Sequence, residues 1–197
     1  MRKADPELKV KRRLQIVEAA TACFIANGFH QTSMQNLSEA TGLSMGLLYR
    51  YFANKNEIID AVAQIDRDAL IAAIDALPDS GDVLGPWSDL LAATIAELSQ
   101  PNTAALINEI YAEAGRNEAL LTSLREHDRQ LLQSIERKLL AQQANSAISS
   151  TLDIAIVAIQ LMALVDGIVA RQIMVPLCNT SSITALVVIS VGQIIER

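Results

Sequence analysis

The chain has 197 residues, a formal net charge of −6 and a hydrophobic fraction of 51%, with few aromatic residues. This length fits one domain or two small ones, and the hydrophobic fraction is ample for a buried core. The two histidines are far apart, the two cysteines lack metal-ligand spacing, and no glycine-rich phosphate loop is present. We therefore expect a protein that is not an enzyme and that binds no metal or cofactor.

The acidic balance argues at first sight against nucleic acid, but the charge is unevenly distributed. Residues 1–60 hold eight Lys/Arg and six Asp/Glu, whereas residues 61–197 hold eight Lys/Arg and sixteen Asp/Glu. A mildly basic segment on an acidic body is typical of a DNA-binding domain fused to a second domain.

The amino-terminal segment is polar, and residues 1–10 are predicted to be mobile. A first helix is predicted over residues 11–27 and ends at Gly28. The cations of this region form either a solvated tail or an arm that attracts phosphate nonspecifically. They are Arg2, Lys3, Lys9, Lys11, Arg12 and Arg13.

Residues 32–55 have the capping pattern of two short helices joined by a tight turn. Thr32 with Gln35 three residues on predicts a capping box, and Gly42 supplies the left-handed residue that ends the first helix. Ser44 is placed to cap a second helix that extends to about Arg50. Helix, short turn, helix is the geometry that places its second helix in a DNA major groove.

The outer face of that second helix suits contact with DNA. Leu43, Leu48 and Phe52 are expected to face inward, which leaves outward Ser44, Met45, Gly46, Tyr49, Arg50 and Tyr51. Gly46 costs a helix about 1 kcal/mol relative to alanine. It indicates either close approach of the backbone to DNA or tight packing against another helix.

At these residues the sequence resembles the tetracycline-repressor (TetR) family. The resemblance rests on I-V-E-A-A-T-A-C-F-I-A-N-G-F, then Thr32, then T-G-L-S-M-G-L-L-Y-R-Y-F-A-N-K-N-E. It implies an all-α homodimer that represses transcription until a small molecule binds its second domain. DNA-contacting residues implied by the family motif are Thr32, Ser33, Ser44, Met45, Gly46, Leu47, Tyr49, Arg50, Tyr51 and Lys55.

Three positions depart from the family pattern. Met45 and Leu47 stand where many members carry polar residues, which shifts the expected base contact toward the thymine methyl group. Ser38 replaces a common alanine. The resemblance favours a helix-turn-helix domain over residues 1–55 and a ligand-binding and dimerisation domain over residues 56–197.

About nine helices are expected in all. After the helix-turn-helix, helices are predicted over residues 56–77, 87–99, 102–115 and 117–143, separated by Pro78, the loop 79–86, Pro101 and Gly115. Two final helices are predicted over about 150–175 and 181–196, and both are apolar on nearly all sides. Such helices must be buried on nearly all sides, so we expect a homodimer through them, with a monomer with a thick core as the alternative.

The effector site is the least constrained part. The predicted ligand contacts are Trp87, Asn108, Tyr111, His127 and Met162, at positions where family pockets usually lie. Only Trp87 and Tyr111 offer rings in this region, which favours an aliphatic over an aromatic ligand. Acidic residues (Glu109, Glu113, Asp166) would instead suit a cation, and Arg116 would suit a carboxylate.

The remaining features concern location and rival functions. Cys23 is expected to be a small buried residue, and Cys178 lies in a predicted loop where redox sensing is an alternative. The longest apolar run, residues 154–165, is too short to span a bilayer, so a cytoplasmic protein without a membrane partner is expected. The expected partners are an inverted-repeat operator in double-stranded DNA and a small effector. A helical adaptor is the rival, and the salt dependence of DNA binding discriminates the two.

Overall fold

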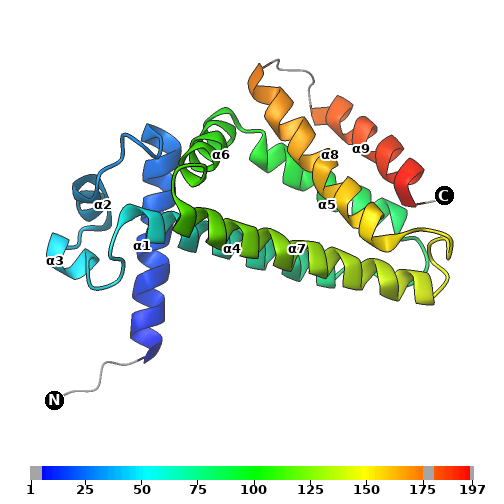
Figure 1. The fold of residues 1–197 in the computed structure, drawn as a ribbon, viewed down its shortest axis with the longest axis horizontal. Coiled ribbons are helices and arrows are strands. Elements are labelled where there is room, and N and C mark those ends of the chain that lie inside the picture. The colour runs from blue at the N-terminus through cyan, green and yellow to red at the C-terminus, as the bar shows by residue number, and fades with distance from the viewer. Residues whose placement is uncertain (1–5, 175–179, 196–197) are drawn as a thin grey trace. The chain divides into compact units, whose positions relative to one another are not determined.

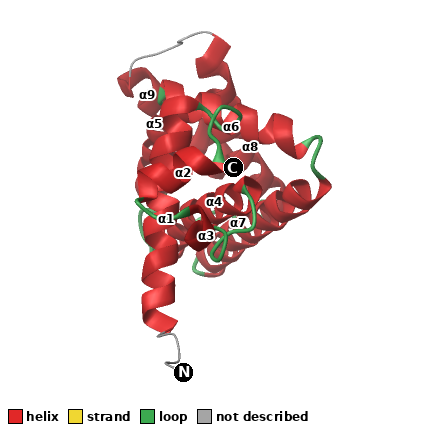
Figure 2. Ribbon diagram, turned by 90° about the vertical axis from the view of Figure 1, so that its left-hand side faces the viewer, coloured by secondary structure: helices red, strands yellow, loops and turns green. Residues whose placement is uncertain are grey.

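The computed structural model describes residues 6–174 and 180–195, and these residues form helices and connecting loops without a strand (Figure 2). This confirms the predicted all-α class, with nine helices in the described part of the chain (Figure 1). Arg2, Lys3 and Cys178 lie outside the described residues. In order the helices are α1 Pro6–Asn27, α2 Met34–Thr41, α3 Met45–Leu48, α4 Lys55–Asp75, α5 Leu84–Leu98, α6 Pro101–Ala114, α7 Glu118–Ala144, α8 Ile154–Met174 and α9 Thr180–Ile195.

The chain divides into two compact units. Unit 1 comprises residues 1–66 and 105–125, and unit 2 comprises residues 67–104 and 126–197. Each unit has its own apolar core, which for unit 1 includes Phe24, Phe29, Leu48 and Phe52. The functional boundary predicted after residue 55 stays a prediction. By packing, the first part of α4 and residues 105–125 belong with the helix-turn-helix.

Unit 2 has α5 packed against α8 and α9, with α8 beside α9 (Figure 1). Its core includes Trp87, Ile95, Leu161 and Val187, each buried. Polar contacts join α7 to the residues that follow α4. There the buried Lys138 Nζ donates to Leu77 O at 2.8 Å and to Asp79 Oδ1 at 2.7 Å.

Three helices begin three or more residues away from the predicted position, each for a local reason. Helix α1 begins at Pro6 rather than residue 11, because proline is pre-organised for a first helical turn. Helix α5 begins at Leu84 rather than Trp87, since Pro86 falls in the first turn, where no N–H is needed. Helix α8 begins at Ile154 rather than about 150, with Asp153 Oδ1 accepting from Ile156 N at 3.3 Å.

Helix α8 extends beyond the uninterrupted apolar run of residues 154–165. Within the described residues, the window Ile154–Arg171 is long and apolar enough, by length and composition alone, to cross a membrane. A helix in the core of a protein passes the same test. Val157, Ala158 and Leu161 of α8 are indeed buried in the core of unit 2.

Candidate nucleic-acid interface

The turn between α2 and α3 is held by hydrogen bonds that its sequence dictates. Gly42 ends α2 in the left-handed conformation (φ 65°, ψ 15°), as predicted, and its N–H bonds Glu39 O. Leu43 N donates to Ser38 O at 3.2 Å, and the Ser38 hydroxyl donates back to Leu43 O. The serine that departs from the family pattern therefore closes the turn.

The start of α2 differs from the prediction. The N-cap is Ser33, whose Oγ accepts from Asn36 N at 3.2 Å, while Ser33 N donates to Asn36 Oδ1 at 2.8 Å. The predicted Thr32–Gln35 capping box is therefore wrong by one residue. Thr32 is 1% exposed and its hydroxyl donates to Gly28 O at 2.7 Å, so this hydroxyl is not presented to solvent.

Helix α3 is short and begins as predicted. Ser44 Oγ accepts from Leu47 N at 3.3 Å, which satisfies one N–H of the first turn. The helix ends at Leu48 rather than Arg50, and residues 49–51 continue as a turn. Leu48 and Phe52 are fully buried, as the apolar spacing predicted, and they anchor α3 to the core of unit 1.

Polar side chains on the residues that flank α3 are exposed to solvent. Ser44, Gly46 and Arg50 are exposed, Tyr49 is 49% exposed, and Met45, Leu47 and Tyr51 are half-buried. A Cβ built at Gly46 meets nothing within 4 Å, which rules out tight packing within the described chain as the reason for this glycine. Close approach of DNA to the backbone at Gly46 stays a prediction.

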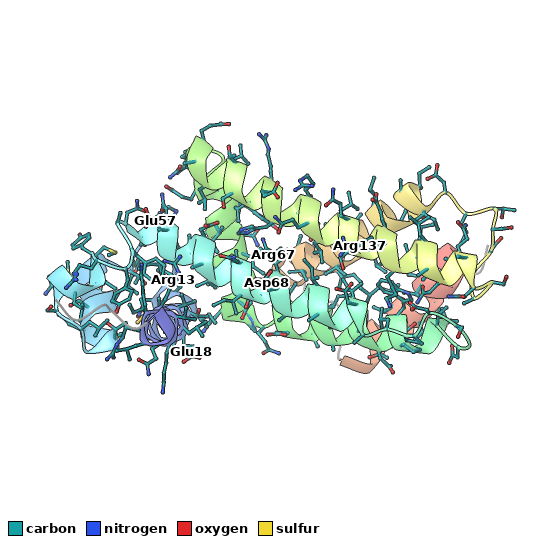
Figure 3. The ribbon with its side chains drawn as sticks, turned by 90° about the horizontal axis from the view of Figure 1, so that it is seen from below. Arg13, Glu18, Glu57, Arg67, Asp68 and Arg137 are labelled. Atoms are coloured by element: carbon teal, nitrogen blue, oxygen red, sulfur yellow. The ribbon has the colours of Figure 1, made fainter. Side chains whose placement is uncertain are left out.

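Arg13 of α1 contacts residues 51 and 52, which follow α3. Its guanidinium carbon lies 4.1 Å from the centre of the Phe52 ring, and its Nη1 donates to Tyr51 O at 3.2 Å. Figure 3 labels Arg13 on α1. A cation predicted to belong to a diffuse basic arm therefore has a defined position on the turn that follows α3.

Lys55 is less available for DNA than predicted. Its Nζ donates to Phe29 O at 2.6 Å and to His30 O at 3.4 Å, and it lies 4.2 Å from the centre of the Phe29 ring. Burial lowers the pKa of Lys55, while the carboxylates of Glu113 and Glu109 act in the opposite direction. Helix α4 begins at Lys55, within one residue of the predicted start, and Asn54 Oδ1 accepts from Glu57 N at 3.0 Å.

The structure disperses the five predicted ligand contacts. Trp87 is fully buried in unit 2 and its Nε1 donates to Gln142 Oε1 at 2.9 Å, so its ring and N–H are engaged in the core. Met162 packs against the same core and His127 is half-buried. Asn108 and Tyr111 belong to unit 1 and are exposed. Ligand contact by these five residues stays a prediction.

The charged alternatives are also dispersed. The Glu109 carboxylate lies against residues 28–30 of unit 1, accepting from Phe29 N at 2.6 Å, and Arg116 is exposed. Burial and the neighbouring Asp128 carboxylate raise the pKa of Asp166 in unit 2. In the described residues, a hollow of about 440 Å³ in unit 2 is lined by Gly81–Leu84, Ser146–Ser149 and Ile195, with none of the predicted ligand residues.

The sequence analysis did not identify two residues that hold the helix-turn-helix region of unit 1. Asn36 completes the cap of α2, and its signal was present as Asn three residues after Ser33. Glu109 contacts a turn 80 residues away in the chain, so no local pattern could reveal it.

A capped pair of short helices joined by a tight turn has the geometry of a helix-turn-helix. The profile described as "Bacterial regulatory proteins, tetR family" matches residues 16–62. The profile described as "BetI-type transcriptional repressor, C-terminal" matches residues 88–189. The chain belongs to the TetR family of bacterial transcriptional regulators, and is not an enzyme.

Individual proteins agree with this assignment. The chain is similar to the HTH-type transcriptional regulator UidR of Escherichia coli (strain K12), with 27% identity over 160 residues, 80% of each chain. Its fold resembles that of Salmonella enterica GusR, with a TM-score of 0.79, 22% identity and full coverage of both chains. It also resembles FadR from Bacillus subtilis, solved in complex with stearoyl-CoA, with a TM-score of 0.75, 18% identity and coverage of 92% and 97%.

Proposed function

We propose that the protein is a repressor that binds an inverted-repeat operator as a homodimer and is released by a small lipophilic effector. The single observation that carries DNA reading is the exposed, capped α3, whose Gly46 faces open space in a protein of a DNA-binding family. Residues 1–55 carry the DNA contacts in this proposal, and residues 56–197 carry effector binding and dimerisation.

The DNA-facing residues fall into two groups. Ser33, Ser44 and Tyr49 offer hydroxyl groups and Arg50 a guanidinium, which suit phosphate oxygens or guanine edges. Met45 and Leu47 offer apolar contact with a thymine methyl group, with Gly46 between them and Tyr51 at the following turn. Thr32 and Lys55 support this surface indirectly, because they bond to residues 28–30, which precede α2.

Selection of bound fragments from random duplex DNA tests the proposal. We expect an inverted repeat, because a two-fold dimer places one reading helix in each of two successive major grooves. The affinity of the selected fragment should fall steeply as salt concentration rises, since phosphate neutralisation releases counterions. A helical adaptor would enrich no sequence and would show no such slope.

Gly46→Ala separates stability from function. Alanine favours a helix over glycine by up to about 1 kcal/mol, and the new methyl group enters open space. We therefore expect the variant to be at least as stable as the wild type yet to bind the selected operator about ten-fold more weakly. Thermal unfolding and gel-shift titration measure the two effects. Unchanged operator affinity would show that no partner approaches this backbone.

Tyr49 and Met45 are expected to act differently on DNA. Tyr49→Phe removes a hydroxyl group that is free to reach a phosphate, so it should weaken binding to every sequence about equally. Substitution of Met45 removes an apolar contact with a base edge, so it should change the sequence preference. A gel-shift panel of operator variants compares the two, and a uniform loss of affinity in Met45→Ala contradicts this division of roles.

Exposed apolar side chains on the last two helices support dimerisation. Within one chain, Ile156, Ile159, Leu186, Val188 and Ile189 of α8 and α9 are each more than 40% exposed. Such a cluster on a helix pair suits burial against a second copy around a two-fold axis. The proposed interface is formed by the two helices predicted over about 150–175 and 181–196, which correspond to α8 and α9.

Release by an effector follows from the same arrangement. Binding to the helical domain would favour a dimer geometry whose half-site spacing no longer matches the groove repeat. A lipophilic effector is supported by the stearoyl-CoA complex of the FadR neighbour and by the apolar core of unit 2. A compound that binds tightly and leaves operator affinity unchanged would count against this mechanism. We propose a cytoplasmic location, where the operator lies.

A further inference from the structure

The turn that follows α1 is bound by a carboxylate from α6. Glu109 Oε2 accepts from Phe29 N at 2.6 Å and from His30 N at 3.3 Å. Successive N–H groups that converge after a left-handed residue form a concave anion site, and Gly28 supplies that residue with φ +81°. Glu109 therefore occupies an anion site built from the backbone of the turn.

The same turn is held on its carbonyl side by Lys55. Its ammonium group accepts no bond and donates to the carbonyl oxygens of Phe29 and His30. The N–H groups of Phe29 and His30 therefore donate to the Glu109 carboxylate, and their C=O groups accept from the Lys55 ammonium. Charge-assisted bonds of this kind are about twice as strong as neutral ones. The approach is close, because a Cβ at Gly28 would lie 2.8 Å from Glu109 Oε1.

Residues 28–30 also set the position at which the helix-turn-helix begins. Thr32 Oγ1 donates to Gly28 O at 2.7 Å, and the next residue, Ser33, is the N-cap of α2. Phe29 is buried and its ring centre lies 5.5 Å from that of Phe24 in the core of unit 1. A displacement of residues 28–30 would therefore move the point at which α2 begins.

Glu109 lies in a segment that packing assigns to unit 1 and that the family profile assigns to the C-terminal domain. Residues 105–125 pack in unit 1 with the helix-turn-helix, yet they fall within residues 88–189, which match the C-terminal repressor profile. Among the contacts of the described residues, the two bonds of Glu109 join this segment directly to the backbone that precedes α2.

We propose that Glu109 is a positioning residue for DNA binding, which holds residues 28–30 so that α2 and α3 present their reading face to the operator. This inference rests on the proposed function. Glu109 touches no DNA, so its loss should lower operator affinity without changing the number of phosphates neutralised.

The test compares Glu109→Ala, Glu109→Gln and a control, Glu113→Gln, in the full-length protein. Glu113 lies one helical turn further along α6 and also acts on the charge of Lys55, but the carboxylate that accepts from Phe29 N and His30 N is that of Glu109. Glutamine at position 109 retains an acceptor oxygen without the charge, so it should restore part of the effect of alanine. Circular dichroism confirms that each variant is folded.

Two readouts are expected to change together. In Glu109→Ala, hydrogen exchange at the amides of Phe29 and His30 should accelerate at least about ten-fold, while exchange in the middle of α1 is unchanged. Affinity for the selected operator should fall about ten-fold, with the same slope against salt concentration. Glu109→Gln should lie between, and Glu113→Gln should resemble the wild type in both.

Other outcomes overturn the inference. Unchanged exchange at these amides in Glu109→Ala would show that the carboxylate does not hold the turn. Faster exchange with unchanged operator affinity would show that the turn does not position the reading helices, and would leave the proposed function intact. A wild-type protein that enriches no duplex would remove the proposed function and this inference with it.

Discussion

Ile159→Glu is expected to convert the protein into a monomer and to lower its affinity for the selected operator by about a hundred-fold or more. Ile159 is 56% exposed in one chain, on the apolar face of α8 proposed to be buried in the dimer. In the proposed dimer, a two-fold axis would place two copies of the substitution in the interface. An unpaired charge in an apolar environment costs several kcal/mol, and loss of the dimer removes the gain from binding two half-sites together.

The measurement is sedimentation or light scattering over a range of protein concentrations, followed by titration of the operator. Ile189→Glu, at a residue of α9 that is 59% exposed, should behave in the same way. Leu140→Glu is the matched control, because Leu140 is an exposed leucine (52%) on α7. A dimer that survives both substitutions in α8 and α9 would place the interface elsewhere.

Trp87→Ala is expected to lower the free energy of unfolding by about 3–5 kcal/mol, the usual cost of truncating a large buried ring. Trp87 is fully buried in the core of unit 2, with its Nε1 bonded to the buried Gln142. Gln142 Nε2 donates in turn to Pro78 O at 2.7 Å. The ring and its N–H therefore support both the apolar core and the polar contact at the end of α4.

Trp87→Phe isolates the hydrogen bond. It keeps most of the apolar ring but leaves Gln142 Oε1 buried without its donor, so a loss of about 1–3 kcal/mol is expected. Tyr111→Ala is the control, since Tyr111 is 60% exposed and its loss should change stability by no more than about 1 kcal/mol. Denaturant unfolding followed by far-ultraviolet circular dichroism, at one fixed protomer concentration, measures all three.

A Trp87→Ala variant of near wild-type stability would contradict the core role. If such a variant had also lost its response to an effector, Trp87 would be a ligand contact as its sequence position predicted. Denaturant unfolding and the effector response, measured together, therefore separate the two roles.

The sequence predicted the elements of the reading unit because their determinants are local. Gly42, Ser44 and the Asn54–Glu57 pair act on backbone groups within a few residues, so their cap geometry is legible without a fold. The all-α class was equally accessible, since proline and glycine separate the helical segments and the apolar spacing repeats at the period of a helix. The local signal was ambiguous at Thr32 and Ser33, because both residue types cap helices.

The structure resolves that ambiguity and changes the environment expected for one charged residue, Lys55. Thr32 is withdrawn from capping because its hydroxyl bonds Gly28 O in a buried site, which leaves Ser33 to cap α2. Lys55 was expected to contact DNA, but the adjacent turn offers its ammonium group two carbonyl oxygens.

The helix-turn-helix and its caps at Gly42 and Ser44 are thus predictable from the sequence alone, since each depends on groups close together in the chain. The anchoring of Glu109 on residues 28–30, the burial of Trp87 against Gln142 and the place of residues 105–125 in unit 1 were decided only by the tertiary structure. The physical reason is that these contacts join residues tens of positions apart, and their partners become neighbours only when the apolar cores assemble.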